Sequence, residues 1–180
     1  MNIRNSSDGN NSQECLNAFL KEQFVALILL YKSNLLTPFL MVFFSTIEIL
    51  GTITGLTFDG FVKKYMTINL PKNIHAVDLW GARCSILHSN SPESEHSKKK
   101  KAKEILYAWG KADINLAKKV IEKAEKANDY TYIKVEDLRS SLEKAVVLLQ
   151  QDFNRYPTFW KNSAKKIDKF YSRIDLNDGA

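Results

Sequence analysis

Apolar residues recur three and four positions apart over most of the chain, and this spacing places them on one face of an α-helix. Such stripes begin near residues 12, 59, 74, 113 and 136. Pro71 and Pro157 separate neighbouring stripes, and proline is disfavoured inside a helix. The pattern therefore predicts a mostly helical single domain.

The segment from Leu35 to Leu56 differs because it is apolar on nearly every side, with Glu48 as its sole charged residue. Thr37 and Pro38 predict where the helix starts, and Gly55 predicts where it ends. A helix of this kind belongs at the centre of a bundle or in lipid. An acidic side chain near the middle of a bilayer costs about 2.5–3.5 kcal/mol. We therefore interpret the segment as a buried helix, with a membrane span as the alternative.

The remaining segments complete the domain organisation. Residues 104–109 and 129–135 are rich in β-branched and aromatic residues and could pair as a small two-stranded ribbon. Residues 89–103 are rich in serine and lysine and predict an exposed loop. We expect a helical domain at 12–173, preceded by a mobile leader at 1–11 and followed by a tail at 174–180.

Charge and cysteine content narrow the classes of function. Lys and Arg number 26 against 20 Asp and Glu, and the net charge of +6 favours acidic partners such as nucleic acid. The loop contains the run Lys98, Lys99, Lys100 and Lys101, which is either a solvated surface or a phosphate-contacting patch. The two cysteines lie far apart, and the N-terminal segment lacks the apolar core of a signal peptide. We expect reduced thiols in a cytoplasmic protein.

One predicted helix carries the candidate chemistry, in the segment DLWGARCSILHS. Cys84 and His88 would supply two metal ligands, but no second pair has the spacing of a zinc site. A Cys–His nucleophilic pair would lack an obvious orienting group. Arg83 can bind two phosphate oxygens, and His88 can transfer protons near neutral pH. Together they could cleave RNA without a metal. The alternative is that Arg83 has a structural role and that His88 only ends the helix, because this spacing also occurs by chance.

The segment from Arg83 to His88 resembles the R-x4-H motif of the HEPN superfamily. STIEIL is similar to the buried helix that precedes the motif helix in that superfamily, and FVKKYM with its proline-containing linker is similar as well. The resemblance covers about residues 16–154 and is specific in the motif region. It implies a helical bundle that acts as a metal-independent endoribonuclease without a cofactor. Arg83 and His88 would be the catalytic pair, and Glu48 would hold Arg83 by a charge-assisted hydrogen bond.

The resemblance also implies partners. HEPN domains commonly form homodimers through the motif helix, where Trp80 and Leu87 would line the interface or else pack in their own core. A toxin–antitoxin or phage-defence role, with an antitoxin partner, is implied too.

Cys84 departs from the pattern, because active members usually carry a polar residue, often asparagine, after the arginine. A thiol is a weak hydrogen-bond donor. A second hypothesis is therefore a non-catalytic module that binds RNA or a protein. A third is a small membrane-associated protein.

Overall fold

The computed structural model describes residues 9–89, 101–123 and 127–170, with the backbone alone for residues 9–11, 88–89, 127 and 168–170. Most of the predicted leader and loop and all of the tail at 174–180 lie outside this range. Lys98, Lys99 and Lys100 lie outside it as well, whereas Lys101 is described.

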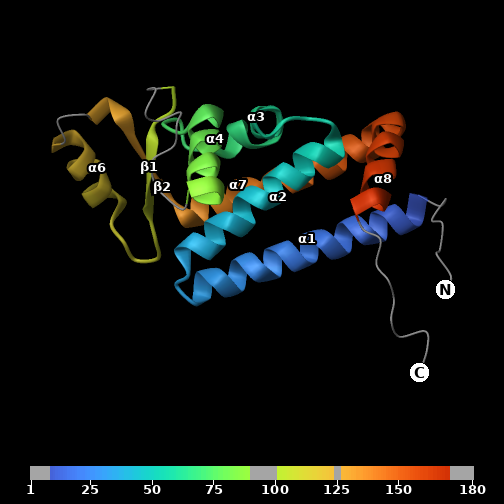
Figure 1. The fold of residues 1–180 in the computed structure, drawn as a ribbon, viewed down its shortest axis with the longest axis horizontal. Helices are drawn as coiled ribbons and strands as arrows, with labels where there is room; N and C mark the ends of the chain where they lie inside the picture. Colours follow the sequence, from blue (N-terminus) through green and yellow to red (C-terminus); the bar gives the residue numbers. More distant parts are fainter. Residues whose placement is uncertain (1–8, 90–100, 124–126, 171–180) are drawn as a thin grey trace.

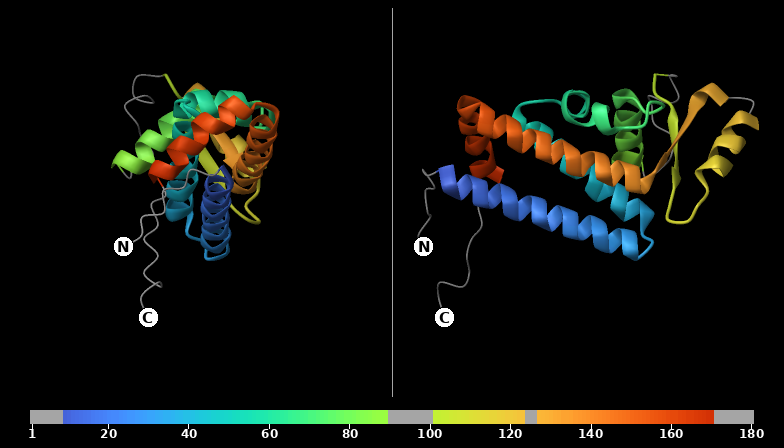
Figure 2. Two further views of the ribbon diagram at one scale, coloured as in Figure 1. Left: turned by 90° about the vertical axis from the view of Figure 1, so that its right-hand side faces the viewer. Right: turned by 180° about the vertical axis from the view of Figure 1, so that it is seen from behind.

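Long helices build the body of the molecule (Figure 1). α1 (Gly9–Lys32) and α2 (Leu36–Thr54) run in opposite directions and are joined by a short turn in which Asn34 has a φ of 56°. α7 (Val135–Arg155) lies along the bundle, and α8 (Pro157–Phe170) packs across one end of it against α1 and α2 (Figure 2). Gly55 ends α2 in the left-handed conformation, which confirms the predicted end of that helix.

A series of short elements connects α2 to the helix that carries the candidate motif. α3 (Phe58–Phe61) leads into a π-helix, η1 (Val62–Met66), and a 3-10 helix, η2 (Thr67–Asn69). α4 (Ala76–Cys84) follows and continues into a second π-helix, η3 (Ser85–Ser89). The candidate arginine therefore lies in the last turn of an α-helix, where the helical pitch changes.

The predicted ribbon forms a parallel pair at one end of the molecule (Figure 1). β1 (Glu104–Ala108) and β2 (Tyr130–Lys134) are in register, with Tyr107 opposite Ile133. Parallel strands need a crossover connection, which α6 (Ile114–Lys123) and the 3-10 helix η4 (Ala127–Asp129) provide. The prediction of a mostly helical chain with a small two-stranded sheet is confirmed.

α2 supplies the centre of the hydrophobic core. Its fully buried apolar side chains are Phe39, Phe43, Phe44, Ile47 and Leu50. The same core cluster includes buried side chains of other helices, such as Leu27 of α1 and Leu142 of α7. Among the described helices, α2 alone is long and apolar enough to cross a membrane, and half of its most apolar stretch is buried in the bundle. A core helix of a globular protein has the same character, so this property alone does not place the chain in a membrane.

Asp152 attaches η1 to α7. Its Oδ2 accepts a hydrogen bond of 2.9 Å from the hydroxyl of the buried Tyr65 and lies 2.8 Å from Lys64 Nζ. Burial alone would raise the pKa of Asp152, but the hydrogen bonds from Lys64 and Tyr65 outweigh it and lower the pKa from its ordinary value of 3.8. The charged carboxylate is therefore the form that stabilises the fold.

We expect the substitution Asp152→Asn to lower the free energy of unfolding by about 1–2 kcal/mol at pH 7, because both partners lose a charged acceptor. The pKa is lowered on folding, so this stabilisation is present above about pH 4 and is lost as the pH falls through the folded-state pKa. Urea unfolding at several pH values should show the difference between variant and wild type shrinking toward pH 3. Glu143→Gln, on the exposed side of α7, is the matched control. A difference that does not change with pH would contradict the assignment.

Candidate functional site

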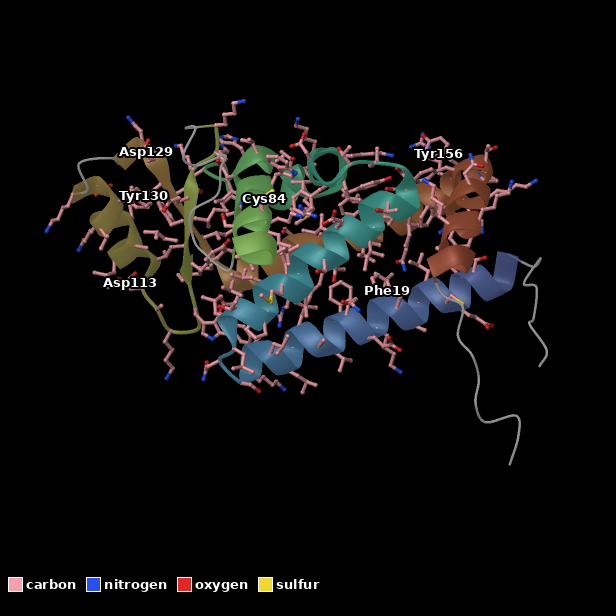
Figure 3. The ribbon with its side chains drawn as sticks, in the orientation of Figure 1. Phe19, Cys84, Asp113, Asp129, Tyr130 and Tyr156 are labelled. Atoms are coloured by element: carbon pink, nitrogen blue, oxygen red, sulfur yellow. The ribbon has the colours of Figure 1, made fainter. Side chains whose placement is uncertain are left out.

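The candidate motif lies on α4 and η3, which pack beside α2. Leu79 and Gly81 face the interior of the bundle, whereas Arg83 and Cys84 are partly buried. Cys84 is labelled in Figure 3, on α4 where this helix passes above α2. Trp80 and Leu87 both pack, partly buried, against the hydrophobic core. The motif is thus built on the surface of the bundle with α2 beneath it.

Asp78 fixes the first turn of the motif helix. Its side chain is 2% exposed, and its two carboxylate oxygens accept hydrogen bonds from the backbone N–H groups of His75 (2.9 Å) and Lys103 (2.8 Å). The first bond caps α4, and the second joins α4 to the chain just before β1. On the other side, the Asn73 side-chain amide donates to Thr131 Oγ1 (2.9 Å) and to the Tyr132 carbonyl (2.8 Å). The first turn of α4 and the segment just before it are therefore both held to the sheet region.

Glu48 and Arg83 meet between α2 and α4. The Arg83 Nε donates to Glu48 Oε2 at 2.8 Å, and its Nη2 donates to the same oxygen. The Arg83 side chain is 17% exposed and the Glu48 side chain 43%. The expected contact between the two residues is present, and it gives the lone carboxylate of the apolar helix a cationic partner.

The third nitrogen of the guanidinium group faces Cys84. Arg83 Nη1 lies 3.9 Å from Cys84 Sγ, a long and weak hydrogen bond. Burial alone would lower the pKa of Arg83, but the bonds to Glu48 and Cys84 raise it above its ordinary value. Arg83 is therefore a permanent cation whose orientation is set mainly by Glu48.

The π-helix η3 changes the relation between positions 83 and 88. In a regular α-helix, residues five apart are turned by about 140° from each other. A π-helix makes i→i+5 hydrogen bonds, so residues five apart lie nearly above one another. Because Arg83 lies in α4 and η3 begins at Ser85, only part of the step from 83 to 88 is π-helical, and it turns the backbone at residue 88 part of the way back toward the side of Arg83. The side chain of His88 lies outside the described part of the structure.

The segment that contains the lysine run is flanked on both sides by described residues of the motif region. The described chain stops at Ser89, the last residue of η3, and resumes at Lys101, which is exposed. Two residues later, the backbone of Lys103 binds Asp78 at the start of α4. The described residues on the two sides of this segment thus lie at opposite ends of the motif helix.

No family model, no curated protein and no solved structure matches this chain. Within the described residues, no group of three or more His, Cys, Asp and Glu side chains could hold a metal ion. Function has to be inferred from the residues of this chain.

A second polar cluster, which the sequence did not indicate, lies where β1 ends. Glu136 Oε1 accepts hydrogen bonds from the Tyr31 hydroxyl and from the Gly110 backbone N–H (3.0 Å). The bond to Glu136 raises the pKa of Tyr31. Trp109 stacks on Tyr31 at 4.7 Å and donates its indole N–H to Asn34 Oδ1 at 3.0 Å. The cluster attaches the sheet to α1 and α7, so Trp109 has a packing role.

Proposed function

We propose that this protein is a metal-independent endoribonuclease of the HEPN type, with Arg83 and His88 as the catalytic pair. The observation that carries the proposal is the contact between Glu48 and Arg83. It joins the acidic residue of the apolar helix to the arginine of the R-x4-H segment. The turn of η3 and the net charge of +6 support the same assignment.

The chemistry follows from the two side chains. His88 would remove the proton from a ribose 2′-hydroxyl, and the resulting oxygen nucleophile would attack the adjacent phosphorus. The bond from phosphorus to the 5′-oxygen would break, and this oxygen would take up a proton from water, while His88 would return its proton to the solvent. The products are a 2′,3′-cyclic phosphate and a 5′-hydroxyl end. Arg83 would stabilise the negative charge on the phosphate oxygens, and Glu48 would be a positioning residue that orients Arg83.

The lysines and the partners extend this proposal. Lys98, Lys99, Lys100 and Lys101 would contact RNA phosphates on either side of the cleaved bond. The cysteine content and the polar N-terminal segment favour a cytoplasmic protein, and the resemblance suggests a homodimer paired through the motif helix. It also suggests a toxin–antitoxin or defence role with an antitoxin as partner.

A second candidate function is a non-catalytic module that binds RNA or a protein. The geometry of Arg83 favours it, because Nε and Nη2 already bind Glu48 and Nη1 faces Cys84. A phosphate group would have to compete with these contacts. In this case Arg83 would stabilise the bundle, and RNA would be held by the lysines without cleavage.

The deciding experiment is a cleavage assay on structured and single-stranded RNA with EDTA present. Wild type should leave 2′,3′-cyclic phosphate ends, and His88→Ala should be slower by at least about 100-fold because the proton-transfer group is lost. His75→Ala, which removes an exposed histidine at the other end of α4, is the matched control and should cleave like wild type. The ends of the products are identified by mass spectrometry.

Each alternative outcome has a distinct meaning. Equal cleavage by wild type and His88→Ala would identify a contaminating nuclease and contradict the proposed site. RNA binding without cleavage by either protein would support the binding module. In that case affinity should fall steeply between low and moderate salt. A protein that can be purified only in detergent would support the membrane alternative.

A further inference from the structure

Lys166 of α8 reaches across to the last turn of α2. Its Nζ donates a hydrogen bond of 3.1 Å to the Thr52 carbonyl oxygen and lies beside Gly55, 2.9 Å from the position that a Cβ atom would take. None of the carboxylates in the described part of the chain forms an ion pair with Lys166. A lysine ammonium group has three N–H donors. The bond to Thr52 caps the end of α2 and leaves two donors and the positive charge for a ligand.

This bond places Lys166 close to the candidate site along α2. Glu48, which binds Arg83, lies four residues before Thr52, or about 6 Å along the helix axis. The two residues share one face of α2, where Thr52 is exposed and the Glu48 side chain is 43% exposed. Seen from the end of the molecule, α8 starts on the side of α7 and ends on the side of α4 (Figure 2). Arg83 and Lys166 therefore lie at the two ends of one exposed stretch of α2.

The surface around this stretch is rich in positive charge. Glu48 is the sole charged residue of α2, and it is already ion-paired. On α8, Lys161 and Lys165 are exposed, and residues 157–167 include no acidic side chain. The side chain of the next acidic residue, Asp168, lies outside the described part of the structure. Spaced cations of this kind bind the phosphates of a nucleic-acid strand.

The neighbouring side chains distinguish a nucleic acid from an anionic membrane. Asn162 and Thr158 lie three and seven residues before Lys165, on the same side of α8, and both are exposed. Both are polar, whereas a helix that binds a membrane inserts apolar side chains beside its lysines. This side of α8 therefore fits a polyanion in solution, and RNA is the polyanion that the candidate site would cleave.

We propose that an RNA strand follows the exposed face of α2 from Arg83 to Lys166, and that Lys166 and Lys165 bind its phosphates. This inference rests on the proposed function, in which Arg83 contacts the phosphate at the cleaved bond. Lys166 then binds a phosphate farther along the same strand. It contributes to the affinity for strands longer than a dinucleotide and takes no part in the chemical step.

RNA of two lengths tests this path, with each variant made in a His88→Ala background so that binding is measured without cleavage. Fluorescence anisotropy gives the affinity for a single strand of about 12 nucleotides, and NMR titration gives the affinity for a dinucleotide, which has one phosphate. Lys166→Gln should weaken binding of the long strand by about threefold to fivefold, the usual size of one exposed charge contact. The slope of log K against log salt concentration should become less steep by about 0.7. Binding of the dinucleotide should not change.

Three further variants separate charge from fold. Lys166→Arg keeps the charge and should bind the long strand like the parent. Lys144→Gln is the matched control, since it removes the same charge from an exposed position on α7 and should also bind like the parent. Lys165→Gln should weaken binding of the long strand by about twofold, and because Lys165 is exposed this result does not depend on the folding of Lys166→Gln. Circular dichroism shows which variants are folded.

Two results would overturn the path along α2. One is a folded Lys166→Gln that binds the long strand as Lys144→Gln does, and the other is an equal loss of affinity for both RNA lengths. Failure of the proposed function has a different signature. In that case the chain with His88 intact leaves RNA uncleaved, while Lys166→Gln still loses affinity for the long strand alone. A chain that binds neither RNA would overturn both proposals.

Discussion

Replacing Asp78 by alanine should lower the free energy of unfolding by about 2–4 kcal/mol, because two backbone N–H groups lose their acceptor at once. Asp78 is buried and binds the N–H groups of His75 and Lys103. These groups belong to the start of α4 and to the chain just before β1. One side chain therefore caps the motif helix and attaches it to the sheet, and its loss should loosen both.

Urea unfolding of wild type, Asp78→Ala and Asp78→Asn measures this effect. Asparagine keeps one acceptor oxygen, so the loss of stability should be smaller in Asp78→Asn than in Asp78→Ala. Asp137→Ala is the matched control, because Asp137 lies in the first turn of α7 but is exposed. The loss of stability in Asp137→Ala should stay below about 1 kcal/mol, the usual size of a charge effect at a helix end. Hydrogen exchange gives a site-specific check, since the Lys103 amide should lose its protection in Asp78→Ala. Equal stability of all four proteins would remove this role from Asp78.

The helices and their buried faces could be predicted from the sequence, because burial of an amphipathic helix leaves a local trace. The stripe through Leu138, Leu142 and Leu149 is buried as the spacing predicts. The apolar segment around Phe43 is a core helix in the bundle. The sequence also predicts that Glu48 has a partner, because a single carboxylate in an apolar helix needs a hydrogen-bonded or cationic partner. The choice of Arg83 as that partner came from the resemblance to HEPN proteins.

Other features of the fold could not be predicted from any local pattern in the sequence. The parallel direction of β1 and β2 depends on the crossover through α6, and strand composition does not encode it. Tyr31 and Glu136 are 105 positions apart, so their hydrogen bond follows only from the way α1 and α7 pack. The π-helical turn after Cys84 likewise has no marker in the residue types of its segment. That turn alters the face of the helix on which residue 88 lies. The residues of the candidate site could therefore be proposed from the sequence, but their relative positions could not.

Replacing Arg83 by glutamine should lower the rate of RNA cleavage by about 100- to 1,000-fold, because the phosphate charge in the transition state loses its cation. The same change removes the partner of Glu48. Breaking a fully buried ion pair costs about 3–5 kcal/mol. Glu48 is 43% exposed and remains partly hydrated, so we expect a smaller loss of stability, about 1–2 kcal/mol. An inactive single variant could therefore reflect either lost chemistry or a weakened fold.

A double-mutant cycle separates these two causes. Glu48→Gln alone should lower stability by a similar amount, since Arg83 then lacks its carboxylate. It should also reduce cleavage less than Arg83→Gln does, because Arg83 keeps its charge but loses its fixed orientation. In the double variant Glu48→Gln with Arg83→Gln, neither charge is left unpaired, and stability should return to within about 0.5 kcal/mol of wild type. Urea unfolding and the kcat and KM of cleavage are measured for all four proteins at one salt concentration.

The double variant decides what Arg83 does. If it is as stable as wild type but still fails to cleave, the loss of rate belongs to the guanidinium group and not to the fold. If it regains cleavage together with stability, Arg83 serves the bundle alone, and the phosphate must be met by other cations such as Lys101. If Arg83→Gln is as stable and as active as wild type, the contact between α2 and α4 contributes to neither property. In that case the resemblance of this segment to the R-x4-H motif has no functional counterpart in this chain.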